Sequence, residues 1–248
     1  MLMPNAQTAL LRDLHKPGAP LLLPNVWDVG SATIVADAGY PALATASASI
    51  SAMLGYDDHE GAPIGEMLDI AAKIIRAVNV PVTVDAEAGY GLHPEELVQR
   101  LTAIGAAGFN YEETDHKAGG PRDVDTQASL IAALRAANSD LVINARIDLY
   151  LTGSPSVEEV AERGRRYLEA GADCIFPILA PSEEVIAELA KAIPGPINVT
   201  CLPGMTVGRL ATLGVARVSF GPMTYLTALE ALKSMARRIQ ADEDPYNA

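Results

Sequence analysis

The stretch that decides the fold is Val80-Pro81-Val82-Thr83-Val84-Asp85-Ala86-Glu87-Ala88-Gly89-Tyr90-Gly91. It begins as a short apolar run rich in valine and preceded by a proline, which is typical of a strand buried on both faces. It ends in two carboxylates two positions apart, followed by a Gly-Tyr-Gly turn. Side chains alternate along an extended chain, so Asp85 and Glu87 would project to the same side if the strand continued that far.

Two like charges on one side of a strand end repel each other, and a bound cation would remove that cost. Carboxylate oxygens are hard ligands that suit Mg²⁺, with Mn²⁺ as a second possibility. A solvated strand end that carries two surface acids is the alternative reading of this stretch alone.

Short apolar runs of this kind alternate with amphipathic segments along the whole chain. Eight of them are predicted as strands, at 19–26, 42–46, 80–85, 108–112, 141–146, 173–177, 196–201 and 216–220. Helices are predicted after them at 31–38, 64–78, 94–104, 125–137, 156–169, 182–192, 206–213 and 223–240. The segments 94–104 and 156–169 carry helix-start signals, a proline in the first turn and a Ser-Val-Glu-Glu capping box.

Glycine follows four of the predicted helices, where a left-handed residue closes a helix; these are Gly39, Gly105, Gly171 and Gly214. Eight strand-then-helix units without a break in composition predict one (β/α)₈ TIM barrel, a single domain over residues 1–248. A doubly wound open sheet is the alternative. It is disfavoured because the first strand is followed by Asn-Val-Trp-Asp-Val-Gly at 25–30 and not by Gly-x-Gly-x-x-Gly.

Bulk composition limits the location and the partners. The chain has 248 residues, of which 49% are hydrophobic, and no apolar run reaches the length of about 18 residues that a membrane helix needs. The N-terminus lacks the basic and apolar regions of a signal peptide, and two cysteines in apolar runs, Cys174 and Cys201, do not form a disulfide framework. We therefore expect a cytoplasmic protein.

The formal net charge of −13 argues against nucleic acid and anionic membranes as partners. The same field would repel an anionic substrate, so a local arginine or a metal ion has to attract it.

In a barrel of this type, function lies at the carboxyl ends of the strands. Acids gather after predicted strands two, three and four, while Arg146 and Asp148 follow strand five; the last three strands end without charge. The acids are Asp57, Asp58 and Glu60 in the loop after strand two, Asp85 and Glu87 after strand three, and Glu112 and Glu113 after strand four. Acids that face one arginine fit a divalent cation beside a guanidinium that grips a carboxylate. Salt bridges that only brace the barrel mouth are the alternative.

Three further features near the strand ends have simpler interpretations. Asp28, after strand one, is predicted as a helix cap. Strand two runs into small residues at 45–51, whose amides are able to hold a carboxylate or phosphate oxygen, or which simply form a packed turn. The segment 114–120 is polar and ends in two glycines, which permit movement.

At these residues the sequence resembles the phosphoenolpyruvate mutase/isocitrate lyase superfamily, from residue 25 to about residue 231. The segment 84–91 resembles the family's Asp-x-Asp-x-Gly-Tyr-Gly, and 144–148 contains its Ala-Arg-x-Asp/Glu. Further matching stretches are 25–32, 45–55, 105–112, 171–176 and 214–221. The family fold is a (β/α)₈ barrel that binds Mg²⁺ and acts on small 2-oxo or 2-hydroxy acids through an enolate.

The resemblance also implies roles for individual residues. It implies Asp85 as the direct metal ligand, Asp58, Glu87 and Glu112 as acids that hold metal-bound waters, Arg146 as the substrate-carboxylate clamp, and the amides around Ala46 and Ser47 as a second carboxylate site. It further implies a homo-oligomer, a dimer or tetramer, because family members commonly exchange C-terminal helices.

The sequence departs from the family pattern in three places. Glu87 replaces an aspartate, and Ala46-Ser47 replaces Ser-Gly. The segment 114–119 contains neither the Lys-Lys/Arg-Cys-Gly-His loop of the isocitrate and methylisocitrate lyases nor the corresponding mutase loop. With the general-acid cysteine absent from this loop, His116 and Lys117 become the candidate proton donors.

The hypothesis is a Mg²⁺-dependent lyase that cleaves a C–C bond of a small carboxylic acid. A phosphonate P–C mutase or hydrolase is the enzymatic alternative. A barrel that binds a metal or a carboxylate without turnover is the non-enzymatic one.

Overall fold

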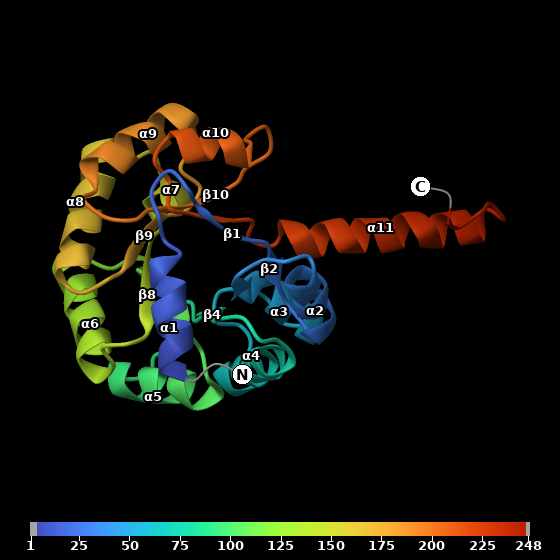
Figure 1. Ribbon diagram of the computed structural model, residues 1–248, viewed down its shortest axis with the longest axis horizontal. Coiled ribbons are helices and arrows are strands. Elements are labelled where there is room, and N and C mark those ends of the chain that lie inside the picture. The colour runs from blue at the N-terminus through green and yellow to red at the C-terminus, as the bar shows by residue number, and fades with distance from the viewer. Residues whose placement is uncertain (1–3, 247–248) are drawn as a thin grey trace.

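The strands of this protein form a closed parallel barrel in a computed structural model that describes residues 4–246. The barrel strands are β1 (Leu21–Leu23), β2 (Asn25–Val26), β3 (Leu43–Thr45), β4 (Val82–Asp85), β5 (Gly108–Glu112), β8 (Val142–Ile147), β9 (Cys174–Pro177), β10 (Asn198–Thr200) and β11 (Arg217–Ser219). Hydrogen bonds order them as β10-β11-β1 and β2-β3-β4-β5-β8-β9. The ring closes because β1 and β2 follow each other along the chain and a bridge joins Ile175 to Ile197. This confirms the predicted (β/α)₈ fold (Figure 1).

Most of the helices cover the outside of the barrel, as Figure 1 shows. The helices of the described residues are α1 (Pro4–Asp13), α2 (Val29–Asp37), α3 (Ser47–Leu54), α4 (Ile64–Ala77), α5 (Pro94–Ile104), α6 (Val124–Ala137), α7 (Leu149–Thr152), α8 (Val157–Glu169), α9 (Glu183–Ala192), α10 (Val207–Thr212) and α11 (Met223–Gln240). All eight predicted helices are present within a few residues of the expected bounds. The sequence reading missed α1, α3 and α7.

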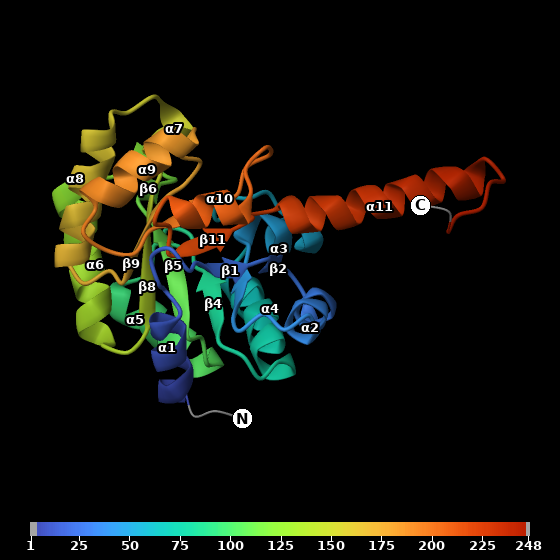
Figure 2. The ribbon, with the colours of Figure 1, turned by 45° about the horizontal axis from the view of Figure 1, so that its top comes forward.

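The main core lies between the strands and the outer helices and includes Phe109, Ile131, Tyr167 and Ile175, all completely buried. A second cluster lies at the amino ends of the strands, where Leu11 of α1 packs against residues of β1, β3 and β8. The helix α1 therefore closes the barrel end opposite to the expected site (Figure 2).

The predicted helix cap and helix-ending glycines are present in the structure. Asp28 caps α2 by accepting a hydrogen bond from the amide of Ser31 at 2.7 Å, in a complete capping box. The glycines at 39, 105, 171 and 214 all have positive φ, so each ends its helix in the left-handed conformation that costs glycine least. Cys174 and Cys201 are free thiols. Among residues 4–246, the structure contains no helix that is both long and apolar enough to span a membrane.

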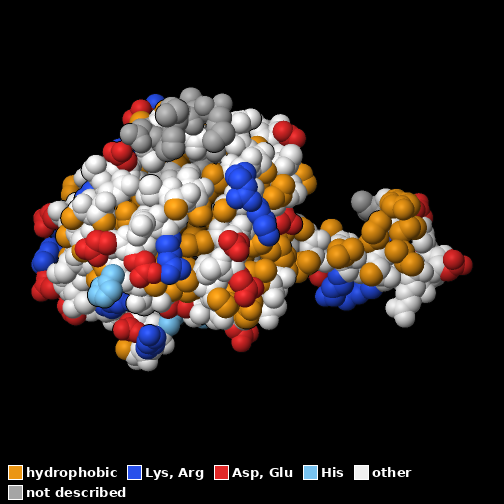
Figure 3. All heavy atoms as spheres, turned by 90° about the horizontal axis from the view of Figure 1, so that it is seen from below, with side chains coloured by type: hydrophobic (Ala, Val, Ile, Leu, Met, Phe, Trp, Pro, Cys, Tyr) orange, Lys and Arg blue, Asp and Glu red, His pale blue; other side chains and the backbone are white. Residues whose placement is uncertain are grey.

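The last helix does not cover the barrel. In Figures 1 and 2, α11 extends away from the body of the molecule as a single arm, and none of its residues is buried. Hydrophobic side chains occupy part of its surface in Figure 3. Met223, Leu226, Leu229, Leu232 and Ile239 are all exposed.

Candidate active site

A cavity of about 320 Å³ opens at the carboxyl ends of the strands. One part of its wall is polar and contains Ala46, Ser47, Asp58, Asp85, Asn110 and Arg146. The opposite part is apolar and contains Phe176, Ile178, Leu202, Phe220 and Met223. The cavity therefore brings together five of the predicted acidic, basic and small residues, together with one apolar surface that excludes water.

Asp85 lies at the end of β4 with one oxygen bonded and one oxygen free. Its Oδ2 accepts hydrogen bonds from the amide and the hydroxyl of Ser47, at 3.1 and 2.9 Å. Within residues 4–246, its Oδ1 is buried without a hydrogen-bond partner, and so is Oδ1 of Asp58, which lines the same cavity. A buried carboxylate oxygen without a donor is costly, so these two atoms mark a place for a cation or for water.

Ser47 and Ala46 occupy the start of α3, which replaces the expected small-residue turn. Ala46 is the N-cap residue and Ser47 the first helical residue. Both line the cavity, and their role as a second carboxylate site stays a prediction. However, both donors of Ser47 are directed to Asp85, so in this conformation Ser47 holds the acid and does not offer its donors to a ligand.

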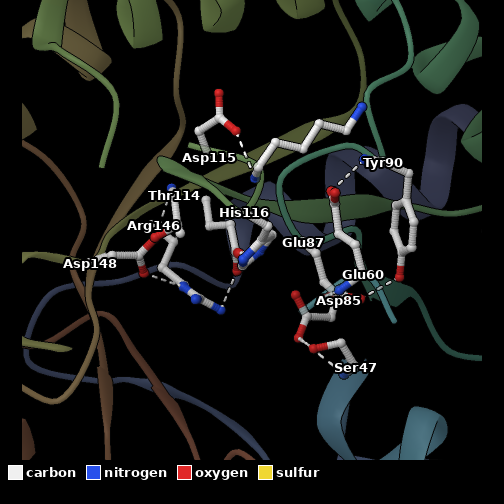
Figure 4. A network of polar contacts seen from close by, with 12 residues as sticks. Ser47, Glu60, Asp85, Glu87, Tyr90, Thr114, Asp115, His116, Arg146 and Asp148 are labelled. Atoms are coloured by element: carbon white, nitrogen blue, oxygen red, sulfur yellow. Dashed lines mark hydrogen bonds and ion pairs between the residues drawn. The ribbon is translucent and has the colours of Figure 1, made fainter. Parts of the chain in front are cut away.

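The strand ends at Asp85, so the alternation that would place Glu87 beside it does not continue. Glu87 has a φ of 47° and is buried within its own turn. Its Oε2 accepts from the amide of Glu60 at 2.6 Å, and its Oε1 accepts from the hydroxyl of Tyr90 (Figure 4). Burial raises the pKa of Glu87 to about 7, and the nearby charge of Asp85 adds to the effect.

The charged residues after β5 and β8 form one buried network. Arg146 contacts Glu112 through Nη1 at 2.6 Å. Its Nε contacts Asp148, also at 2.6 Å (Figure 4). Asp148 is held in turn by the amide and hydroxyl of Thr114, at 3.1 and 2.6 Å. Burial raises the pKa of Glu112, against the opposing effects of its bonds to His116 and Arg146. The predicted clamp is thus anchored on two sides, and no residue between 4 and 246 forms a hydrogen bond or ion pair with its Nη2.

The candidate proton donors lie on a small hairpin of β6 (Thr114–Asp115) and β7 (Gly120–Pro121), in place of the expected irregular loop. Nε2 of His116 contacts Oε1 of Glu112 at 2.5 Å, and this bond raises the pKa of His116. Lys117 is exposed. Neither side chain lines the cavity. His116 is bonded to Glu112 of the site, and among the described residues the side chain of Lys117 has no such bond.

The residues present fit a cation that keeps most of its water. Among residues 4–246, no three His, Cys, Asp or Glu side chains are arranged to enclose a metal ion by themselves. Mg²⁺ usually binds through one or two carboxylates and retains several waters, which agrees with the two free oxygens of Asp85 and Asp58. Glu87 and Glu112 lie nearby but are engaged by Glu60, Tyr90, His116 and Arg146.

Several polar residues of the site were missed from the sequence. Asn110 was not noticed at all, whereas Glu60, Tyr90 and Asp148 were noticed in the sequence but were given no role in the site. Asn110 had a detectable signal, since an asparagine within the apolar strand Gly-Phe-Asn-Tyr-Glu requires partners in the barrel interior. The contacts of Glu60 and Tyr90 depend on left-handed turns at both residues, which no local pattern indicates.

Comparisons with known proteins agree with this geometry. The family model described as phosphoenolpyruvate phosphomutase matches residues 11–240. An uncharacterized protein of Mycobacterium tuberculosis is 36% identical over 232 residues, covering 93% of this chain and 89% of that protein. The 2-methylisocitrate lyase of Aeropyrum pernix is 31% identical over 247 residues, covering 93% of this chain and 79% of the lyase.

A crystal structure from Burkholderia cenocepacia, provisionally named a phosphonomutase, superposes with a TM-score of 0.90 at 39% identity. The match covers 95% of this chain and 99% of that one. With the family model matched over nearly its whole length, the chain belongs to the phosphoenolpyruvate mutase/isocitrate lyase superfamily of lyases and mutases.

Proposed function

We propose that the protein is a Mg²⁺-dependent lyase that cleaves a C–C bond of a small 2-oxo or 2-hydroxy carboxylic acid. The observation that carries the proposal is the pair of buried, unpartnered oxygens of Asp85 and Asp58 in the same cavity as Arg146. A cation at the two oxygens and a carboxylate at the guanidinium would each satisfy groups that the protein alone leaves open.

The protein's own residues would bind and orient such an acid. Nη2 of Arg146 donates to a substrate carboxylate, while Glu112 and Asp148 fix the plane of the guanidinium. The apolar wall of Phe176, Ile178 and Phe220 excludes water from the carbon that loses its bond. When bound, the metal supplies positive charge that stabilises an enolate oxygen as it forms.

The reaction also needs a proton at the carbon that is left. His116 is the candidate that the geometry favours over Lys117, because it is bonded to Glu112 beside Arg146. A small movement of the β6–β7 hairpin would bring His116 to the cavity. Lys117 would have to move from solvent.

P–C bond chemistry is the second candidate, because the matching family model is described as a phosphomutase and the structure with the highest identity quoted above is provisionally a phosphonomutase. The sequence of the segment 114–119, which lacks the loop residues of both branches, does not decide between the two chemistries.

A substrate panel tests the proposal. The protein is incubated with oxaloacetate, 2-methylisocitrate, malate and phosphonopyruvate, each with Mg²⁺ or with EDTA, and products are followed by proton and phosphorus NMR. We expect Mg²⁺-dependent C–C cleavage of at least one of the first three acids. Turnover of phosphonopyruvate alone would favour the P–C chemistry. Binding without turnover of any acid would indicate a non-catalytic barrel.

A further inference from the structure

The interior of the barrel directly below the cavity is polar. Arg217 of β11 is 1% exposed and extends into this interior, where Nη2 donates to Oδ1 of Asn110 at 3.1 Å. Its Nε and Nη1 are buried and have no hydrogen-bond partner in the part of the chain that the structure describes. Among the described residues, no carboxylate forms an ion pair with it. Burying an unpaired guanidinium is costly, so its position requires an explanation other than packing.

The hydrogen bonds below Asn110 fix the orientation of its side-chain amide. Oδ1 accepts from Arg217 and also from Nδ2 of Asn144, at 2.8 Å. An arginine only donates, so the atom of Asn110 that faces it has to be the oxygen. The side-chain amide of Asn110 therefore has one favoured orientation, with Oδ1 toward Arg217 and Asn144. Because Asn110 lines the cavity, its Nδ2 is then the polar atom available to a ligand there.

The location of that Nδ2 group suits an anionic ligand. Asn110 is paired in register with Asp85 on one side and with Asn144 on the other, so it lies between the strand of the free acid and the strand of Arg146. A donor at this point complements an oxygen of an acid that spans the two strands. An aspartate here would add a further negative charge to a cavity that already contains Asp58 and Asp85.

We propose that Asn110 determines specificity by donating a hydrogen bond from Nδ2 to an oxygen of the bound acid, and that Arg217 and Asn144 position it. The inference rests on the proposed function and deepens it. Burial lowers the pKa of Arg217 only to about 10, so the guanidinium stays protonated and keeps its donor role at neutral pH. This role accounts for a buried charge that faces an amide.

The replacement Asn110→Asp tests the donor directly. An aspartate still accepts from Arg217 and Asn144, so the fold is retained, but the cavity now meets an acceptor in place of a donor. Oxalate serves as the probe, and its binding with Mg²⁺ is measured by isothermal titration calorimetry. We expect its Kd to rise about tenfold or more, because the donor is lost and the new carboxylate repels the anion. The melting temperature should not fall.

Asn198→Asp is the matched control. Asn198 is also completely buried in a barrel strand, but it does not line the cavity. Its variant should bind oxalate within about twofold of wild type if affinity depends on the donor of Asn110. Oxalate binding by Asn110→Asp as tight as wild type would overturn the inference and leave the proposed function intact. No Mg²⁺-dependent oxalate binding by wild type would overturn both.

A double-variant cycle tests the positioning role of Arg217. Arg217→Met should weaken oxalate binding, and Arg217→Lys, which keeps a donor, should restore part of the affinity. In the Asn110→Ala background, Arg217→Met should change the Kd by less than about twofold, because the group it positions is gone. Equal effects of Arg217→Met in both backgrounds would show that Arg217 acts on the structure and not through Asn110.

Discussion

At the scale of the residue, the contacts of Arg146 with its neighbouring carboxylates determine its pKa and the net charge of the site. Burial acts to lower the pKa of Arg146, but Asp148 and Glu112 raise it above its ordinary value. The two carboxylates hold the guanidinium rigidly and also more than neutralise it. A cavity with Asp58 and Asp85 as well is therefore negative overall, and an anionic substrate needs a cation to enter it.

His15 gives a pH prediction at the same scale. It is buried at the amino end of the barrel, with Nδ1 2.7 Å from the carbonyl oxygen of Leu11. Burial and the charge of Arg217 lower its pKa from 6.5 to about 4. The unfolded chain therefore binds a proton at higher pH than the folded one. Stability contributed by neutral His15 is present above pH 6.5 and is lost as the pH falls toward 4, by about 3 kcal/mol in all.

His15→Asn should remove this dependence, because its amide keeps a donor for Leu11 but does not titrate. Urea unfolding at pH 7.5 and pH 5 measures the effect. Wild type should lose about 2 kcal/mol more than the variant between these values. His93→Asn, at an exposed position, should behave as wild type. Equal losses in wild type and His15→Asn would contradict the prediction.

The sequence predicted those site residues that lie at or next to the carboxyl ends of strands. Asp85 and Arg146 end parallel strands, which places both at the same mouth, and Asp58 joins them from the loop of β3. Glu87 could not be placed because the strand ends at Asp85 and Glu87 itself is left-handed, so the alternation of side chains does not extend to it. Arg217 escaped notice because a lone arginine in an apolar strand reads as a surface residue.

At the scale of the element, the long connection after β3 is ordered in part because it forms the helix α3. Its sequence, Ser-Ala-Ser-Ile-Ser-Ala-Met-Leu, has weak helix propensity and lacks a side-chain cap. It is held by burial of Ile50 and by the bonds of Ser47 to Asp85. Such tertiary support is invisible in sequence, whereas the amphipathic helices such as α4 and α8 were predicted from their apolar stripes alone.

The β6–β7 hairpin gives the element-scale prediction. It is joined to the site by His116, bonded to Glu112, and by Thr114, bonded to Asp148. Oxalate with Mg²⁺ should therefore slow hydrogen exchange of the amides at 114–121. The measurement is exchange followed by mass spectrometry, with the peptide at 138–141, at the opposite barrel end, as the unaffected reference.

His116→Ala should abolish most of this protection, because it removes the link to Glu112. Lys117→Ala should retain it, since Lys117 is exposed and makes no side-chain contact with the site acids in this conformation. Exchange at 114–121 that is the same with and without the ligand would show that the hairpin is only a connection.

At the scale of the whole molecule, the arm formed by α11 is unstable in isolation. Helices in proteins gain most of their stability from packing of an apolar face, and the leucines of this 18-residue helix are exposed. We propose that α11 packs against a second copy of the chain, so that the protein is a homo-oligomer. The apolar residues Leu226, Leu229, Leu232 and Ile239 would form this contact.

Light scattering at micromolar concentration tests the assembly. Wild type should have the mass of a dimer or a larger oligomer, while Leu229→Glu combined with Leu232→Glu should shift it toward the monomer. Ser234→Glu, on the opposite side of the helix at 100° per residue, should leave the mass unchanged. A wild-type protein that is strictly monomeric would contradict the proposal.

The central claim is that Asp85 and its neighbours hold a cation that the reaction requires. The most direct measurement is turnover, at saturating Mg²⁺, of whichever acid the panel identifies, compared among wild type, Asp85→Ala and Asp57→Ala. Asp57 provides the control because it removes the same charge from an exposed position in the neighbouring loop.

We expect Asp85→Ala to lose at least about a hundredfold in turnover, because the charge that stabilises the enolate is no longer held in place. Its fold should persist, because the buried side chain of Ile50 still holds α3 when the two hydrogen bonds from Ser47 to Asp85 are lost. Asp57→Ala should retain wild-type turnover. Near-normal turnover by Asp85→Ala at saturating Mg²⁺ would contradict the account.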